Sequence, residues 1–331
     1  MRIRLVVVAA FVAATTASQA QAPATATPES LVLAAKRAAG QDYAGTFLRI
    51  CVAPDNLATG TGVGGRGAAN AAPAARVVPD RATWYAQPYK VFDNLYFIGT
   101  RIHSAWALTT SDGIIVIDTL FDYAIEPEIV EGLSGLGLNP RDIKYVVISH
   151  AHGDHDQGAA LLQSRYGAKV VMGVPDWDAT VQRPSTAAGG VPKRDVGVGP
   201  EGRKITLGDT TIDVIATPGH TPGTLSMVFR VRDNGTTHTV AYWGGNGLNA
   251  DRESLQQYIQ SAQRFSDLAR QAGADVMMSN HTDWDGSKAY LPRLRPRPPG
   301  SANPYVVGAQ GIARYLDVAR ECATARLLRL N

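Results

Sequence analysis

The chain has 331 residues, of which 45% are hydrophobic and 18% are charged. This composition predicts a globular protein with a substantial buried core. Lys and Arg number 32 against 29 Asp and Glu, so the formal net charge is only +3. Apart from the Arg-Leu-Arg-Pro-Arg run at 293–297, which is typical of a solvated turn, no dense basic cluster occurs. We therefore expect no nucleic-acid partner.

The first residues are typical of a secretory signal peptide. Two arginines precede an apolar run from Leu5 to Ala14, and small residues follow at spacings that a signal peptidase accepts. A membrane anchor would need about 18 or more apolar residues, which is longer than this run. We predict a signal peptide over 1–22, cleaved near Ala20 or Ala22. The mature protein is then periplasmic or secreted, with no segment that spans a membrane.

The two cysteines, Cys51 and Cys322, lie near opposite ends of the mature chain. In an exported protein such a pair is explained by a disulfide that ties the N-terminal extension to the last helix, or by two separate buried thiols. Neither cysteine lies beside the histidine motifs described below. A thiolate nucleophile or thiolate metal ligand is therefore not expected.

Residues 23–85 are predicted to form an N-terminal extension. It begins with a helix at 28–40 and continues through Ala-, Gly- and Pro-rich sequence such as 60–67. Because glycine loses the most backbone entropy on ordering, we expect this stretch to be a surface loop. The main domain, with a C-terminal helix, is predicted over 86–331.

Short strand-like runs, turn signals and helical patterns alternate through the main domain. Sheets with helices outside them indicate an α/β sandwich, and no clear internal repeat is present. A β-meander is predicted at 90–99, 105–110 and 114–118, with later strands at 145–149, 168–172, 204–207, 211–216, 225–231, 237–243 and 274–279. Helices are predicted at 126–136, 159–166, 254–272 and 310–330.

Three of the seven histidines fall within six residues, directly after a predicted strand, as His150-Ala-His152-Gly-Asp154-His155. Alternate residues of an extended segment point the same way. His150 and His152 can therefore converge on one ion, while the following turn directs Asp154 and His155 towards a neighbouring ion. Imidazole and carboxylate suit zinc, although iron and manganese accept the same ligand types.

Two more histidines follow strand-like runs, namely His220 within the Thr-Pro-Gly-His-Thr-Pro-Gly loop at 217–223, and His281. The prolines that flank His220 stiffen its loop, as a metal ligand requires. We interpret both histidines as ligands. His103 and His238 lack such a setting and are interpreted as ordinary histidines. On this interpretation, replacing His103 leaves the metal content unchanged.

These motifs resemble the metallo-β-lactamase superfamily over roughly 89–289. The resemblance implies a four-layer αββα sandwich with the metals at one edge between the sheets. It also implies two zinc ions. The motif does not fix the substrate, because lactamases, lactonases, glyoxalase II-type thioesterases and nucleases share it. The implied ligands are His150, His152 and His220 for the first ion, and Asp154, His155 and His281 for the second.

The absence of a bridging aspartate limits which members of the superfamily the chain resembles most. Glyoxalase- and lactonase-like members carry a bridging aspartate after the strand that follows the third histidine, whereas 242–249 here holds neither carboxylate nor cysteine. The chain therefore most resembles subclass 3 of the class B β-lactamases, which are exported and need no bridging side chain. Gly247 and Asn249 replace serines common in that subclass. Because asparagine can donate to a substrate carboxylate, Asn246 and Asn249 are the predicted substrate-binding residues.

The predicted function is that of an exported dinuclear zinc hydrolase that opens the β-lactam amide of antibiotics by a metal-bound hydroxide. Asp154 is the predicted catalytic residue, both as a ligand and by orienting the hydroxide. Asp118, at a strand end, is either an acceptor for a ligand histidine or a plain cap.

Other functions remain open. The first alternative is a lactone, ester or thioester hydrolase of the same superfamily, followed by a metal-dependent nuclease and a metal-binding protein without activity. A nuclease would need a basic groove, and a purely structural zinc site would be closed by four protein ligands. The expected partner is a small-molecule substrate, and the sequence does not indicate the oligomeric state.

Overall fold

The computed structural model describes residues 26–52, 78–183, 185, 187, 189–295, 297–298 and 300–330. The predicted signal peptide and the glycine-rich loop at 60–67 lie outside the described residues. Among the helices that are described, none combines the length and apolar character needed to cross a membrane.

Two β-sheets form the centre of the molecule. In the first sheet the strands follow chain order, antiparallel from β1 to β4 and parallel from β4 to β7. Its strands are β1 (Tyr89–Phe92), β2 (Leu95–Phe97), β3 (Trp106–Thr110), β4 (Gly113–Ile117), β5 (Ile143–Val147), β6 (Lys169–Gly173) and β7 (Val196–Val198). In the second sheet, ordered β12-β11-β10-β9-β8, only β11 and β12 pair in parallel. Its strands are β8 (Arg203–Leu207), β9 (Thr210–Ala216), β10 (Leu225–Asp233), β11 (Thr236–Trp243) and β12 (Val276–Ser279).

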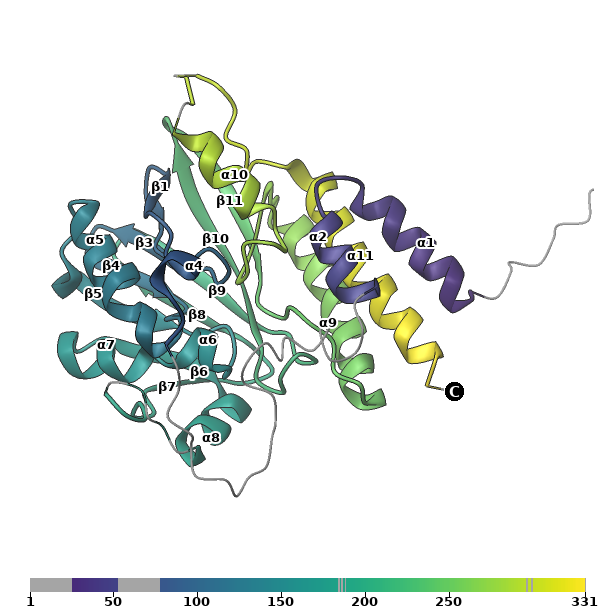
Figure 1. Cartoon of the computed structure of the whole chain (residues 1–331), viewed down its shortest axis with the longest axis horizontal. Coiled ribbons are helices and arrows are strands. Elements are labelled where there is room, and N and C mark those ends of the chain that lie inside the picture. Colours follow the sequence, from purple (N-terminus) through teal and green to yellow (C-terminus); the bar gives the residue numbers. More distant parts are fainter. Residues whose placement is uncertain are drawn as a thin grey trace, which may run out of the picture.

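Helices cover the outer faces of both sheets, which gives four layers (Figure 1). The second sheet is covered by α9 (Arg252–Gln271) and α11 (Gly308–Leu328), and α1 (Pro28–Ala39) packs against α11. The first sheet is covered by η3 (Ile125–Val130), α5 (Glu131–Gly135), α7 (Ala159–Tyr166) and α8 (Val174–Gln182). The short elements are α2 (Ala44–Phe47), η1 (Leu48–Val52), α4 (Arg81–Trp84), η2 (Asp122–Ala124), η4 (Pro140–Asp142), α6 (Gly153–Asp156) and α10 (Ser287–Leu294). The α/β sandwich and the four layers implied by the resemblance are confirmed.

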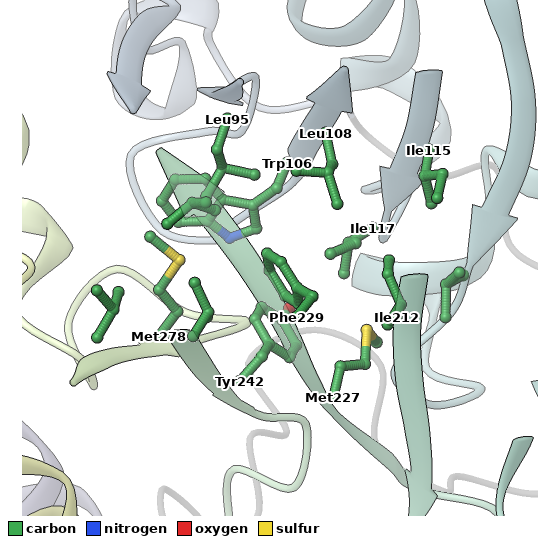
Figure 2. Close-up of a cluster of buried hydrophobic side chains, with 14 of the residues drawn as sticks. Leu95, Trp106, Leu108, Ile115, Ile117, Ile212, Met227, Phe229, Tyr242 and Met278 are labelled. Atoms are coloured by element: carbon green, nitrogen blue, oxygen red, sulfur yellow. The ribbon is translucent and has the colours of Figure 1, made fainter. Parts of the chain in front are cut away.

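The main core lies between the two sheets (Figure 2). In β9 buried and more exposed residues alternate, because successive side chains of a strand point to opposite faces. In β4, residues 114–117 are all buried, as expected of a strand covered on both faces. Ile115 and Ile117 of the first sheet belong to the same cluster as Phe229 of the second. This packing fixes the two sheets against each other and so fixes the strand ends that carry the site.

The N-terminal extension is held against the C-terminal helix. Cys51 and Cys322 form a disulfide, which decides between the two explanations that the sequence left open. Thr27 and Ser30 form a capping box at the start of α1, with Pro28 inside the first turn. Covalent and packing contacts thus keep α1 and α11 together over the second sheet.

The predicted elements are present with bounds shifted by a few residues, with two kinds of difference. The run predicted as a single strand at 90–99 is a hairpin, since the chain turns at Asp93 and Asn94 between β1 and β2. Several elements were not predicted, namely α8, β7, α10 and the short helices α2, η1, α4, η2, η4 and α6. They are short or lack a periodic apolar pattern, and tertiary contacts stabilise them.

Candidate metal centre

The candidate ligands follow strands of both sheets. His150 and its neighbours follow β5, His220 follows β9, and His281 follows β12. Parallel neighbours end at the same edge of a sheet, so the residues after β4, β5 and β6 are brought together there. The opposed sheet adds the ends of β9 and β12, so the four predicted ligands that follow β5 meet His220 and His281 from the second sheet.

Asp118, directly after β4, anchors the first histidine segment. Its Oδ1 accepts a hydrogen bond of 2.7 Å from the Ser149 backbone N–H, and its Oδ2 accepts one of 2.9 Å from the Ser149 hydroxyl. Asp118 has φ +59°, a left-handed conformation that is uncommon for a residue other than glycine. Its hydrogen bonds hold it in this conformation, which places the carboxylate beneath the site.

The first ligand group consists of His150, His152 and His220. Their ligand atoms lie within 4.8 Å of one another. The Nε2 atoms of His150 and His220 are 3.1 Å apart. His150 and His220 are buried, whereas His152 is accessible to solvent. The three imidazoles therefore face one point that solvent can reach.

The hydrogen bonds of the buried histidines fix which ring nitrogens face that point. His150 Nδ1 lies 3.1 Å from the Gly244 carbonyl oxygen, and His220 Nδ1 lies 3.1 Å from that of Gly247. A carbonyl only accepts, so each Nδ1 carries the hydrogen and each neutral ring turns an Nε2 lone pair inward. Burial, with the neighbouring His152, lowers the pKa of His220 to about 3, and burial holds the pKa of His150 well below its usual range. The lone pairs on His150 Nε2 and His220 Nε2, which lie 3.1 Å apart, are thus arranged to bind one cation between them.

The second group surrounds Oδ2 of Asp154. Nε2 of His155 lies 3.1 Å from this oxygen, and Nε2 of His103 and of His281 each lie 3.5 Å from it. The Nε2 atoms of His155 and His281 are 3.2 Å apart. Burial alone would raise the pKa of Asp154, but His155, His103 and His281 hold it well below its usual range. A carboxylate among imidazoles suits zinc.

His155 is oriented by the carboxylate of Asp118, whose Oδ2 lies 3.0 Å from Nδ1 of the ring. The structure thus gives Asp118 the first of the two roles left open, that of an acceptor for a candidate ligand histidine. Burial opposes a charge on His155, but Asp154 and Asp118 together raise its pKa to about 10. The two carboxylates draw a positive charge to this position, and a metal ion can supply it in place of the proton.

His103 is the main departure from the sequence-based interpretation. It was treated as an ordinary histidine, yet it joins Asp154 and His281 in a group whose ligand atoms lie within 4.8 Å of one another. No local motif marks it, because it precedes β3 and is brought to the site by a β-bridge to His281. His238, also treated as ordinary, lies elsewhere and pairs with Asp275 at 2.7 Å.

The two predicted substrate-binding asparagines make contacts within the protein. Asn246 is buried, with its Oδ1 accepting from the Tyr315 hydroxyl at 2.9 Å and its Nδ2 donating to Asn280 at 2.7 Å. Asn249 Nδ2 donates to the carbonyl oxygens of Gly219 and His220, at 2.9 and 3.0 Å. Asn249 therefore braces the loop that carries His220.

Asp176, near the start of α8, was not singled out from the sequence. Its Oδ2 accepts from the Ala151 backbone N–H and from the Thr221 hydroxyl, both at 2.8 Å, and its Oδ1 accepts from the Gly223 N–H at 2.9 Å. One carboxylate thus joins the two loops that supply the first ligand group. A Cβ on Gly223 would lie 2.6 Å from the Asp176 carboxyl carbon, so glycine is required there. A carboxylate shortly after the predicted strand at 168–172 was the available signal.

Comparison with known proteins agrees with this geometry. Residues 98–235 match the family model of the metallo-β-lactamase superfamily. Two curated relatives are an N-acyl homoserine lactonase of Azorhizobium caulinodans, 26% identical over 183 residues, and a hydroxyacylglutathione hydrolase of Acidiphilium cryptum, 30% identical over 125 residues. The matches cover 48% and 38% of this chain but only 66% and 44% of those relatives.

A similar solved structure is that of BJP-1, a subclass B3 metallo-β-lactamase of Bradyrhizobium japonicum. It has a TM-score of 0.58 and 26% sequence identity, over 70% of this chain and 91% of that one. The chain therefore carries a metallo-β-lactamase domain, and its structural neighbours are subclass B3 metallo-β-lactamases.

Proposed function

We propose that this protein is an exported hydrolase that binds two zinc ions and opens the amide bond of β-lactams. The domain and the candidate ligand groups support the coarser statement, a metal-binding hydrolase of this superfamily. The ion count, the substrate and the export are the steps that the proposal adds.

The observation that carries the β-lactam proposal lies in the segment after β11. The superfamily's lactonase- and glyoxalase-like members place a bridging aspartate there, whereas Asn246 occupies the segment here and is bonded to Tyr315 and Asn280. In the described part of the chain, the two ligand groups include a single carboxylate, Asp154. This pattern favours the B3 β-lactamases, to which the fold is also similar.

The chain's own residues would divide the work between them. When bound, two zinc ions would supply an activated water and positive charge for the transition state. His150, His152 and His220 would hold one ion, and Asp154 with His281 and His155 would hold the other. Asp154 directs Oδ2 at the imidazoles, so its Oδ1 can accept a hydrogen bond from the attacking water and orient it. Asp118 keeps His155 in place.

Export rests on separate support. The Leu5–Ala14 apolar run is typical of a signal peptide, and the Cys51–Cys322 disulfide is typical of oxidising compartments such as the periplasm. We therefore propose a periplasmic or secreted enzyme. Detection of the mature protein in a periplasmic extract, with its N-terminus near Ala20 or Ala22, would test this; a cytoplasmic full-length chain would contradict it.

A second candidate function is the hydrolysis of lactones or thioesters. It is favoured by the curated relatives, which are a homoserine lactonase and a hydroxyacylglutathione hydrolase. Both reactions use the same attack of water on a carbonyl, so the metal centre serves either substrate class. The substrate must therefore be determined by experiment.

The test is a side-by-side measurement of kcat/KM on zinc-loaded protein. The substrates are a chromogenic cephalosporin, a carbapenem, an acyl-homoserine lactone and an acyl-glutathione thioester, with His220→Ala as the control for site-dependent turnover. We expect the two β-lactams to be opened fastest. Efficient turnover of the lactone or thioester with intact β-lactams would establish the second candidate instead.

A further inference from the structure

We propose that His103 is a ligand of the second metal ion, together with Asp154, His155 and His281. This ion is then closed by four protein side chains, while the first ion, held by three histidines, keeps an open position. The inference rests on the dinuclear site of the proposed function and adds a ligand that the superfamily motifs do not include.

The imidazole nitrogens of His103, His155 and His281 each approach Oδ2 of Asp154 at the spacing of neighbouring metal ligands. At zinc bond lengths of about 2.0–2.2 Å, tetrahedral ligands lie roughly 3.3–3.6 Å apart. Oδ2 of Asp154 lies 3.1 Å from Nε2 of His155 and 3.5 Å from Nε2 of both His103 and His281. The His155 and His281 nitrogens are 3.2 Å apart. The His103 imidazole therefore stands in the same relation to Asp154 as that of His281.

The backbone holds His103 in this position from both sides. A β-bridge pairs His103 with His281. Next to it, the Ser104 N–H donates to the Asn280 carbonyl at 2.9 Å, and the Thr282 N–H donates to the Ile102 carbonyl, also at 2.9 Å. These bonds fix the two histidines as one unit, so His103 is preorganised rather than carried on a mobile loop.

The turn before His103 and the rings around it complete this arrangement. A Cβ on Gly99 would lie 2.5 Å from the His103 carbonyl oxygen, so only glycine permits the close turn. The His103 ring packs edge-on against Phe121 and His281, with centroids 5.1 and 5.2 Å away. Its side chain is only 15% exposed. Packing thus limits the ring to orientations near Asp154.

A fourth protein ligand gives the two ions different roles, because it closes the second site and leaves the open coordination position on the first ion. Structural zinc sites are closed by four protein ligands, whereas catalytic sites keep an open position. The second ion should therefore be held tightly and act through its charge, and the substrate carbonyl should approach the side of His150, His152 and His220. The accessible face of His152 agrees with this direction of approach.

The experiment isolates the second site in a His220→Ala background, where the first site lacks a ligand. Zinc affinity is measured by chelator competition in this variant, in His220→Ala/His103→Ala and in the matched control His220→Ala/His238→Ala. We expect the His103 change to weaken zinc binding by at least about tenfold, because losing even a hydrogen-bond partner of a ligand costs about 10- to 100-fold. The His238 change should leave the affinity unchanged.

Cobalt(II) and a conservative variant separate coordination from positioning. The visible bands of Co(II) depend on the number and kind of its ligands, so replacement of the His103 imidazole by water should change the bands of the second site. His220→Ala/His103→Gln keeps a hydrogen-bond donor for Asp154 without an imidazole, and we expect it to lose affinity as the Ala variant does. Full affinity in the Gln or the Ala variant, or unchanged cobalt bands, would overturn the proposal. A wild-type protein that binds fewer than two ions would instead refute the dinuclear site.

Discussion

The two ligand groups are built on different principles. The first consists of three imidazoles, two of them buried and neutral, whose Nε2 lone pairs are set by carbonyl acceptors. The second combines imidazoles with the carboxylate of Asp154 and has a further carboxylate, Asp118, behind His155. The first group thus offers neutral donors, whereas the second offers negative charge. We expect the second group to bind its cation more tightly and the first to leave more room for exchange and chemistry.

The largest expected effect follows removal of a ligand from the first group. His220→Ala should lower the zinc content from about two ions to about one and abolish turnover, because two imidazoles remain for that ion. Metal analysis after dialysis, together with kcat/KM, measures both. His238→Ala is the control, since this imidazole pairs with Asp275. Equal metal loss in both variants would mean that the ligands are misassigned or that the chain unfolds.

The second-largest effect on the first metal site is expected at Asp176, whose carboxylate joins the two loops of the first ligand group. Asp176→Asn keeps the shape of the side chain but loses the charge that accepts from Ala151, Thr221 and Gly223. We expect a loss of about 10- to 100-fold in zinc affinity of the first site or in kcat/KM, as is typical of residues that orient ligands. Asp178→Asn, an exposed aspartate on the same helix, is the matched control. Selective weakening of the second site would contradict the role assigned to Asp176.

A smaller effect is expected at Asn249. The sequence predicted contact with a substrate carboxylate, whose loss would raise KM more than it lowers kcat. The structure shows its amide donating to Gly219 and His220 instead. A net hydrogen bond is worth roughly 0.5–1.5 kcal/mol, so Asn249→Ala should reduce zinc affinity of the first site a few-fold to about tenfold. A change in KM with unaltered zinc affinity would restore the substrate-binding role.

A site residue could be predicted from the sequence when a local motif, and not a contact between distant segments, places it at the site. Local motifs were enough to predict that His150, His152, Asp154 and His155 lie together, because adjacent residues after one strand must share one strand end. His220 and His281 followed from the same reasoning together with the superfamily resemblance. The periodic patterns likewise predicted the α/β layers. These layers are confirmed, because strands buried on one face alternate apolar and polar residues, whereas strands buried on both faces form short continuous apolar runs.

His103 and Asp176 were missed for a common physical reason. His103 reaches the site through a bridge to His281, and Asp176 through bonds to two loops, all between segments distant in sequence. Neither contact leaves a local pattern of residue types. The unpredicted α8, which carries Asp176, is a helix of only nine residues and therefore gives a weak periodic signal. Tertiary contacts decide such positions.

The smallest effect on the site is expected from Glu128, a buried carboxylate in η3 remote from both groups. Burial raises the pKa of Glu128 to about 8, although it accepts a hydrogen bond of 2.8 Å from Ala86 N–H. Because the folded-state pKa is raised above the unfolded value, its stabilising contribution is present below about pH 4.5 and is lost as the pH rises through about 8. Glu128→Gln should therefore gain stability relative to wild type by on the order of a few kcal/mol between about pH 5 and pH 9.

Denaturant unfolding of both proteins across this pH range measures the difference, with zinc content as the second readout. The zinc content of Glu128→Gln should equal that of wild type at each pH. A stability difference that does not grow with pH would contradict the assigned pKa, and a lower zinc content would show that the fold and the metal centre are coupled.

The most direct test of the two-group account is a zinc titration of the metal-free, full-length mature protein. Two sets of ligands of unequal charge predict uptake of about two ions per chain in two resolved steps, the tighter step assigned to the group around Asp154. Loss of the weaker step in His220→Ala would confirm that assignment. Saturation of the wild-type protein at one ion, or no uptake at all, would contradict the account.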